Sequence, residues 1–362
     1  IDTHRKAIKP VSLEAYAAFL FDHHQLLPQR EQPGTDPAID GQTQLQRSLG
    51  LLDGVAAPAA GWEQDILPAR VKDYDPNWLD VMCISGRVSW GRYSLPITSL
   101  RGHARRKNAT PVKSTPITLA SRQNLDLWQA LARAQADSKE SAKPGAVAQR
   151  IEQDLKAHGA SFFDQIQKRT GLLRTQLEQG LAELVSCGRI CSDSYTGLRA
   201  LLTPTHKKAG GSSRRGRRAM FGVEDAGRWS LLDTFEAVDD PEVSSHPDSF
   251  RHWDVLNEEQ LERLIAIYLQ RWGVVSRSAI DRENLAPPWR VLLLSLRKME
   301  LRGTVRGGRF IAGIGGEQFA YAETVDSLRK FGKGDVAVDG KDYFTLAATD
   351  PINLVNLILP KQ

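Results

Sequence analysis

Cysteine is scarce in this sequence, and long apolar runs are absent from it. The chain of 362 residues has three cysteines, Cys83, Cys187 and Cys191. Three cysteines provide no even framework of disulfides, which favours a reducing compartment such as the cytoplasm. The longest apolar run, residues 15–21, is far shorter than the roughly 18 residues that a membrane-spanning helix needs. We therefore expect a cytoplasmic protein with no membrane partner.

Motifs for nucleotide and metal chemistry are also missing. The nearest approach to a phosphate-binding loop, residues 334–342, has one residue too many between its glycines and Asp342 where a hydroxyl should bind magnesium. Gly188 separates Cys187 from Cys191 and should end a helix there, and no histidine pair lies nearby. We expect no cofactor, no metal site and no ATP hydrolysis in this chain.

The charge is unevenly distributed, although its sum is only +5. Residues 101–113 carry five basic and no acidic residues, and residues 203–222 carry six basic and no acidic residues. Residues 223–264 then hold 12 acidic residues and three arginines. Neither basic segment has helical or strand periodicity, so we predict two mobile basic linkers. Such segments can lie along phosphates and release counterions, and the candidates in the second one are Arg214, Arg215, Arg217 and Arg218.

A pattern of three helices followed by a β-hairpin occurs three times, and we call each occurrence a module. In the second module, residues 144–202, Ser161 should cap a short helix and Thr175-x-x-Glu178 should open the third helix. Gly188 suits the left-handed turn after that helix. Residues 189–192 and 197–202 then predict the two strands of the hairpin. Three helices and a hairpin are typical of a winged-helix domain.

The third and first modules follow the same plan. In the third, residues 257–321, Asn257 caps the first helix, Ser276 opens the second, and Pro287-Pro288 start the last. Residues 304–305, 309–311 and 318–320 are expected to form its wing. The first module, residues 43–96, is weaker and is preceded by an amphipathic helix from Ser12 to about Leu27. These patterns predict a mainly α fold with small β-hairpin wings, in the α+β class.

Three stretches of the chain also resemble the C-terminal half of the Lhr (large helicase-related) bacterial superfamily-2 helicases, in the order of that family. They are Pro58–Glu63 with Leu67–Val71, Tyr74–Pro76 and Ser85–Gly91; Gly159–Phe163 with Leu181–Val185 and Ser192–Ser194; and Gly227–Leu232 with Arg271–Arg277, Gly308–Ile311 and Gly315–Ala320. The chain does not begin with methionine, and we expect both ends to be cut from a longer protein.

The resemblance implies tandem winged helices that follow a helicase core. It further implies that the segment with Ala347–Pro351 begins a β-barrel. The expected organisation is 1–100, an N-terminal helix and first winged helix; 101–143, a basic loop and helical connector; 144–202, the second winged helix; 203–256, a basic arm and acidic linker; 257–340, the third winged helix; and 341–362, the start of a truncated β-barrel.

The function that the resemblance implies is DNA binding beside the motor of an ATP-dependent 3'-5' repair helicase. ATP and magnesium would belong to the parent protein. The implied partners are single-stranded or duplex DNA, an RNA:DNA hybrid, the helicase core of the same protein and a homo-oligomer, in the bacterial cytoplasm at the nucleoid. One alternative is a winged-helix DNA glycosylase that removes uracil or damaged bases. Another is an oligomerisation or protein-docking scaffold, which the apolar run Val291–Leu294 favours.

Base excision needs a carboxylate or an amide pair beside the sugar of a flipped nucleotide. Gln44-Leu45-Gln46 is similar to the glutamine pair of winged-helix glycosylases, but the pattern also fits two exposed glutamines on a helix. Asp350 is a second candidate, and it also fits a turn before Pro351. The family's catalytic carboxylate could equally lie in the rest of the barrel, so the catalytic residue stays open.

In a winged helix the third helix enters a DNA groove and the wing contacts phosphate or the minor groove. The candidate contacts outside the basic segments are arginines of the third helices and wings, namely Arg87, Arg92, Arg290, Arg297, Arg306 and Arg309. Two glycines separate Arg306 from Arg309, which should allow backbone and guanidinium to approach one phosphate. The second module has Glu178 and Glu183 on its third helix, so we expect it to pack rather than to read DNA.

Overall fold

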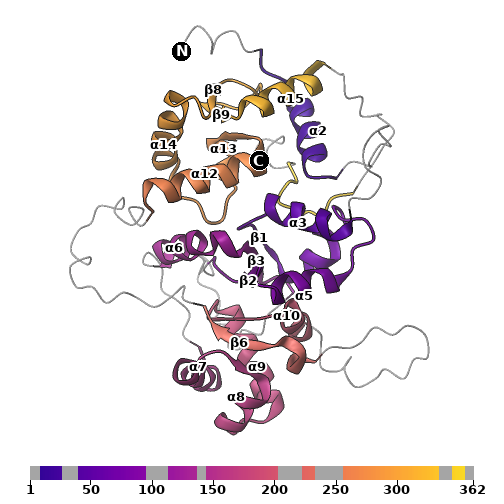
Figure 1. Cartoon of the computed structure of the whole chain (residues 1–362), viewed down its shortest axis with the longest axis vertical. Coiled ribbons are helices and arrows are strands. Elements are labelled where there is room, and N and C mark those ends of the chain that lie inside the picture. Colours follow the sequence, from indigo (N-terminus) through magenta and orange to yellow (C-terminus); the bar gives the residue numbers. More distant parts are fainter. Residues whose placement is uncertain are drawn as a thin grey trace, which may run out of the picture. The chain divides into compact units, whose positions relative to one another are not determined.

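The computed structural model describes residues 9–26, 40–94, 113–136, 144–202, 222–232, 256–333 and 345–354 (Figure 1). The chain divides into two compact units, each described by itself. Unit 1 comprises residues 1–53, 65–74 and 253–362, and unit 2 comprises residues 54–64 and 75–252. The basic segment 203–222 and its expected mobility lie almost wholly outside the described residues. No helix in the described ranges has the length and apolar character to cross a bilayer.

The described residues form three small antiparallel sheets with one shared strand order. Each module supplies a strand after its first helix and two strands after its third helix, and the last of these strands is central. The sheets are β1 (Ala56–Pro58), β3 (Pro116–Ser121) and β2 (Val88–Gly91); β4 (Ser161–Phe162), β6 (Arg228–Leu231) and β5 (Ile190–Ser192); and β7 (Val274–Ser276), β9 (Gln318–Ala320) and β8 (Arg306–Gly308). This threefold repetition confirms the tandem winged-helix fold.

Unit 1 contains the third module together with helices from the start of the chain. Its helices are α2 (Leu13–His23), α3 (Gly41–Leu51), α12 (Glu258–Trp272), α13 (Arg277–Ile280), α14 (Trp289–Leu301) and α15 (Ala322–Lys333). Asn257 caps α12 by accepting from the Gln260 amide at 2.8 Å, and Ser276 caps α13, as predicted. Helix α2 packs against α15, and α3 packs against α12 (Figure 1).

Three side chains of the N-terminal segment satisfy the carbonyls that end α12. The Tyr16 hydroxyl donates to the carbonyl of Trp272 at 2.9 Å, and the ring nitrogens of His23 and His24 donate to the two preceding carbonyls, at 2.6 and 2.9 Å. The last carbonyls of a helix have no partner within the helix, so these contacts fix α2 on the C-terminal end of α12. Val11 extends the attachment, because its backbone pairs with that of Phe310 and Ala312.

Unit 2 holds the sheets of the first and second modules. Its helices are α4 (Ala59–Gly61), the π-helical turn η1 (Trp62–Ile66, which ends in unit 1), α5 (Pro76–Ile84), η2 (Arg122–Asn124), α6 (Leu125–Ala136), α7 (Ala146–His158), α8 (Phe163–Thr170), α9 (Arg174–Ser186), α10 (Tyr195–Leu202) and η3 (Val223–Ala226). Trp90 joins the two sheets, since its indole donates to the Ser194 carbonyl at 2.9 Å and meets the rings of Tyr195 and Trp229 edge-on.

The structure corrects the expected wing of the second module. Residues 197–202 belong to helix α10, and the second strand of the wing is β6, on the far side of the basic segment. The sequence predicted a strand that starts at Gly197. In the structure this glycine lies in α10 and allows the helix to lie close to β5, η3 and β6. A Cβ there would stand 2.6 Å from Ser192 Oγ and 2.7 Å from the Ala226 Cβ.

Other local expectations also change. Helix α9 begins at Arg174, and its N-cap Leu173 donates its amide to the Gln176 side chain, so the capping box of Thr175 and Glu178 does not form. Residues 309–311 are not a strand, and residues 345–354 contain no strand that would begin a barrel. Both basic segments fall between paired strands, before β3 and before β6, and therefore lie within modules rather than between them.

Candidate nucleic-acid interface

The third module presents a helix and a wing side by side. Helix α14 buries Leu292, Leu296 and Met299 against the module and exposes its opposite face. After Gly303, whose φ of +80° suits the left-handed turn that ends the helix, the chain enters β8. The wing loop, residues 309–317, connects β8 to β9.

A buried glutamine holds the wing loop in shape. The Gln318 side chain accepts hydrogen bonds from the amides of Phe310 and Ile311, at 2.8 and 2.9 Å. It donates to the carbonyls of Ile311 and Ile314, at 3.1 and 2.9 Å. A buried primary amide with all its hydrogen-bonding capacity used specifies one conformation of the loop. This role could not be predicted from sequence, because a glutamine that opens a short strand has no distinctive pattern.

Arg306 and Arg309 are both exposed, and no partner of either side chain is present among the described residues. Arg306 opens β8 opposite Ala320 and is therefore at the base of the wing. Arg309 is the first residue of the loop. Since residues 309–311 are not a strand, Phe310 and Ile311 are both buried while Arg309 points to solvent. Two unpaired guanidiniums on one edge suit phosphate contact.

The basic residues of α14 are largely engaged with carboxylates of the same module. Arg297 pairs with Glu317 of the wing loop at 2.8 Å, and Lys298 pairs with Glu258 of α12 at 3.0 Å. Arg302 pairs with Glu262, one turn further along α12. The predicted contacts Arg290 and Arg297 are exposed, and Arg290 also has an interaction within the chain. Exposed ion pairs contribute little to stability, so a phosphate can compete for these cations.

In the first module, only one of the two predicted arginine contacts is exposed to solvent. Arg87 is exposed, but Arg92 is directed inward and donates to the carbonyls of Ser94 and Ser186. Burial lowers the pKa of Arg92. The structure therefore places Arg92 at the C-terminal end of α9, where it joins the first module to the second. Of these two predicted contacts, only Arg87 is presented to solvent.

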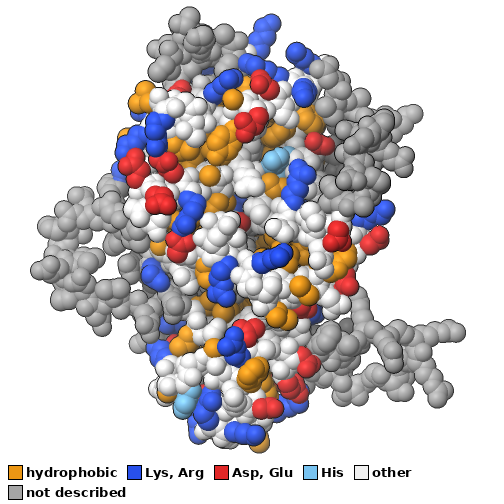
Figure 2. Space-filling view, viewed as in Figure 1, with side chains coloured by type: hydrophobic (Ala, Val, Ile, Leu, Met, Phe, Trp, Pro, Cys, Tyr) orange, Lys and Arg blue, Asp and Glu red, His pale blue; other side chains and the backbone are white. Residues whose placement is uncertain are grey.

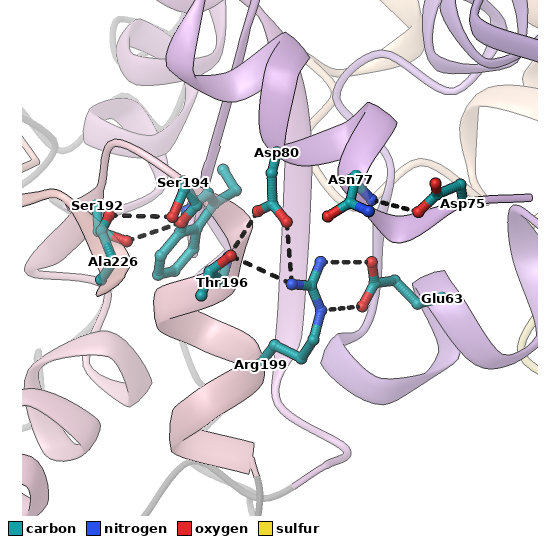
Figure 3. A network of polar contacts seen from close by, with 10 residues as sticks. Glu63, Asp75, Asn77, Asp80, Ser192, Ser194, Thr196, Arg199 and Ala226 are labelled. Atoms are coloured by element: carbon teal, nitrogen blue, oxygen red, sulfur yellow. Dashed lines mark hydrogen bonds and ion pairs between the residues drawn. The ribbon is translucent and has the colours of Figure 1, made fainter. Parts of the chain in front are cut away.

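Helix α5, the third helix of the first module, carries a carboxylate instead of cations. Asp80 accepts from the Thr196 amide at 2.8 Å and pairs with Arg199 at 3.0 Å (Figure 3). Arg199 also forms a two-point pair with Glu63, both contacts at 2.8 Å. Burial lowers the pKa of Arg199, but the hydrogen bonds and charges of Glu63 and Asp80 outweigh burial and raise it. This polar side of α5 is covered by α10 and is not available to DNA.

In the second module, the arginine at the start of α9 is held by acids. Arg174 pairs with Glu178 at 3.1 Å and with Glu224 at 2.7 Å. The prediction that this module packs rather than reads DNA is supported by these pairs and by the contacts of α10 with the first module. The four predicted arginines of its basic segment, Arg214, Arg215, Arg217 and Arg218, lie outside the described residues. Figure 2 shows basic and acidic side chains interleaved on the face in view, without one continuous basic patch.

Two of the three catalytic candidates, Asp350 and Gln44, contact the same short segment of unit 1, residues 70–72. Asp350 is buried and accepts from both terminal nitrogens of Arg70, at 2.7 and 2.9 Å, and from the Ile352 amide at 2.9 Å. Gln44 is buried on α3 and accepts from the Lys72 amide at 3.1 Å, whereas Gln46 is exposed. Both Asp350 oxygens are occupied, so this carboxylate anchors the C-terminal segment and is poorly placed to orient water.

The remaining reactive side chains among the described residues are cysteines and possible metal ligands. Within the described ranges, no group of three or more His, Cys, Asp and Glu side chains could hold a metal ion. Burial raises the pKa of the Cys83 and Cys187 thiols, which makes both poor nucleophiles at neutral pH.

The apolar run at the start of α14 is mostly part of the core, because Leu292 is buried, Val291 and Leu293 are half-buried, and only Leu294 is exposed.

Comparison with known proteins agrees with this architecture. Models for two winged-helix domains of the large helicase-related protein match residues 11–105 and residues 254–338. The chain is 31% identical over 374 residues to the Lhr helicase/uracil glycosylase of Escherichia coli (strain K12), covering 98% of this chain and 22% of that protein. It is 28% identical over 363 residues to the Lhr helicase/probable uracil glycosylase of Mycolicibacterium smegmatis, covering 96% and 21%.

The chain thus spans about a fifth of the length of these curated relatives. Among solved structures, the Streptomyces sahachiroi DNA glycosylase AlkZ aligns with a TM-score of 0.44 and 14% sequence identity, over 89% of this chain and 72% of that one.

Proposed function

We propose that this chain, which carries two winged-helix domains of the large helicase-related family, is the DNA-binding C-terminal region of an ATP-dependent repair helicase and holds or steers DNA beside the motor. The observation that carries the proposal is the wing of the third module, where Arg306 and Arg309 are exposed and, in the described part of the chain, unpaired. The helicase core, an RNA:DNA hybrid, a homo-oligomer and a place at the nucleoid are further partners and settings of this proposal.

The proposed contacts are with phosphates and are independent of sequence. Each phosphate that a cation neutralises releases condensed counterions, so affinity falls as salt rises. Replacing Arg306 and Arg309 with alanine should weaken binding to all DNA sequences about equally. It should also reduce the slope of log affinity against log salt by roughly two.

A matched control removes two charges from another surface of the same unit. Lys330 and Lys333 are exposed on α15. The K330A/K333A variant has the same net charge as R306A/R309A and should keep the salt slope of the wild type. An unchanged slope in a folded R306A/R309A protein would show that the wing does not touch DNA, and a protein-docking role would then be favoured.

A second candidate function is base excision. It is supported by the names of the relatives, which include uracil glycosylase. It is also supported by Gln44, whose buried side chain accepts from the Lys72 amide, two residues along the chain from the Arg70 that binds Asp350. The test is release of uracil from uracil-containing DNA by the purified chain. If Gln44 orients the reacting groups, Gln44→Ala should abolish release, whereas the exposed Gln46→Ala variant should retain it.

A further inference from the structure

Among the residues that the structure describes, the exposed large apolar side chains are confined to a few helices. In the described ranges there are six, and all lie on the second and third helices of the modules or at the start of these helices. They are Val81 and Ile84 on α5, Phe162 at the start of α8, Leu173 at the start of α9, and Leu294 and Leu301 on α14. Single exposed apolar residues are ordinary, but exposed apolar residues that recur on the same helices of each module point to contact sites on those helices.

The charges around these residues differ between the modules. Helix α5 contains no lysine or arginine, and its one acid is bound to Arg199. Leu173 is followed by Arg174, which two glutamates neutralise. Of the described helices that bear these residues, α14 has the largest excess of cations, with Arg290, Arg297 and Lys298 against Glu300. It is therefore the one best suited to attract a polyanion, for which Arg297 exchanges its exposed pair with Glu317 for a phosphate.

On α14 the two residue types share one face. Arg290, Leu294, Arg297 and Leu301 follow one another at intervals of four, three and four residues, which places them in one row on a helix. Leu294 is 64% exposed and Leu301 is 75% exposed. Directly beyond the helix, residues 302–304 are exposed, as is Arg306 on the first wing strand. Glu300, which precedes Leu301 in the sequence, is turned to the wing and accepts from the Gly307 amide at 3.2 Å.

Phosphates can satisfy the arginines of this row but offer nothing to the leucines. In DNA the extensive apolar surfaces are the faces of the bases, and in an intact duplex these faces are stacked on one another. Unpaired bases leave them open, and proteins use apolar side chains as wedges against base steps and as platforms for single strands. A row of alternating arginine and leucine therefore fits a strand with unpaired bases better than it fits a closed duplex.

We propose that Leu294 and Leu301 pack against the faces of unpaired DNA bases while Arg290 and Arg297 hold the flanking phosphates. This inference rests on the proposed function and narrows it to single-stranded or locally unpaired DNA. The exposed patch Val81 and Ile84 of α5 has no cation on its helix and serves as the matched control, since it should not contact DNA.

The test compares three ligands of equal length and charge density per strand. They are a single strand with bases, a strand of abasic sites with the same number of phosphates, and the duplex of the first strand. The full chain should bind the base-bearing single strand more tightly than the abasic strand. The L294A/L301A variant should lose about tenfold in affinity for the base-bearing single strand and change little on the abasic strand and the duplex. L294F/L301F should gain affinity for the base-bearing strand, because aromatic rings stack on bases.

The controls separate this inference from the proposed function. V81A/I84A should bind all three ligands within about twofold of the wild type, and R306A/R309A should weaken binding to all three. Both leucines are exposed, so their replacement should leave folding intact, which circular dichroism checks. A wild type that binds none of the ligands would refute the proposed function itself. A wild type that binds them, with L294A/L301A unchanged or weakened equally on all three, would overturn the role of the leucines alone.

Discussion

Helices α5 and α14 are the third helices of two modules with the same strand order, but their surface residues make different contacts. Helix α5 uses its polar side to hold α10 through Asp80, Thr196 and Arg199, and it exposes only uncharged residues. Helix α14 pairs its cations with carboxylates of α12 and the wing loop, and it keeps a face with arginines and leucines in solvent. A winged-helix fold alone therefore does not indicate whether its third helix contacts DNA, because the residues that the helix exposes differ between modules.

The largest expected effect is on the stability of unit 2. Arg199→Ala removes the cation between Glu63 and Asp80, whose side chains are only 15% and 10% exposed. Two carboxylates left without their countercharge in a partly buried site should cost about 4 kcal/mol of unfolding free energy. Urea unfolding measures this loss. The comparison variant Arg302→Ala breaks an exposed pair of α14 and should change stability little. Equal losses in the two variants would contradict the difference drawn between α5 and α14.

The next largest loss of stability is expected for Gln318→Ala. It leaves two amides and two carbonyls of the wing loop without their partner, and we expect a loss of about 3 kcal/mol in unfolding free energy. DNA affinity should fall with it, because the loop that presents Arg309 loses its shape. Full stability and full DNA affinity in this variant would show that the wing loop is held by other contacts. Calorimetry and a binding titration measure the two effects.

The attachment of α2 to α12 should make unit 1 sensitive to acid. Burial lowers the pKa of His23, and burial with the nearby Arg70 charge lowers the pKa of His24 well below 6.5. Because the folded protein favours the neutral rings, their contribution to stability is complete above pH 6.5 and is lost as the pH falls below it. Unfolding measured from pH 7.5 to 5.0 should show this decline, and His24→Gln should reduce its slope. A wild type equally stable across this range would contradict the prediction.

The smallest effect should be a gain in DNA binding. Glu317→Gln removes the carboxylate that competes with phosphate for Arg297, and affinity for DNA should rise about two- to threefold at low salt. Glu323→Gln, an equal charge change on α15, is the control and should have less effect. If both variants gain equally, net charge rather than release of Arg297 explains the result.

Helix ends and the threefold plan could be predicted because their signals are local. Asn257 before α12 and Ser276 before α13 each act within a few residues, and each lies where the sequence predicted. The wing of the second module could not be predicted from local pattern. Its second strand, β6, follows β5 only after α10 and the basic segment, and residues 197–202 have the apolar content of either a strand or a buried helix.

Much of the candidate site also depends on contacts between distant residues. Asp350 meets Arg70 across 280 positions of the chain, so no spacing rule could distinguish a buried anchor from a catalytic acid. The loss of Arg92 from the set of exposed cations likewise follows from its contact with Ser186. Arg306 and Arg309 were identifiable as surface residues, but the pairing of β8 with β9 was needed to place Arg306 at the base of the wing.

The most direct test of the account is hydrogen–deuterium exchange of the whole chain with and without single-stranded DNA. We expect DNA to slow amide exchange across the wing of the third module, residues 306–320, and at the exposed end of α14. We expect no change across α5, whose polar side is already covered by α10. Slowed exchange across α5 with none in the third module would contradict the central claim that the third module is the one that meets DNA.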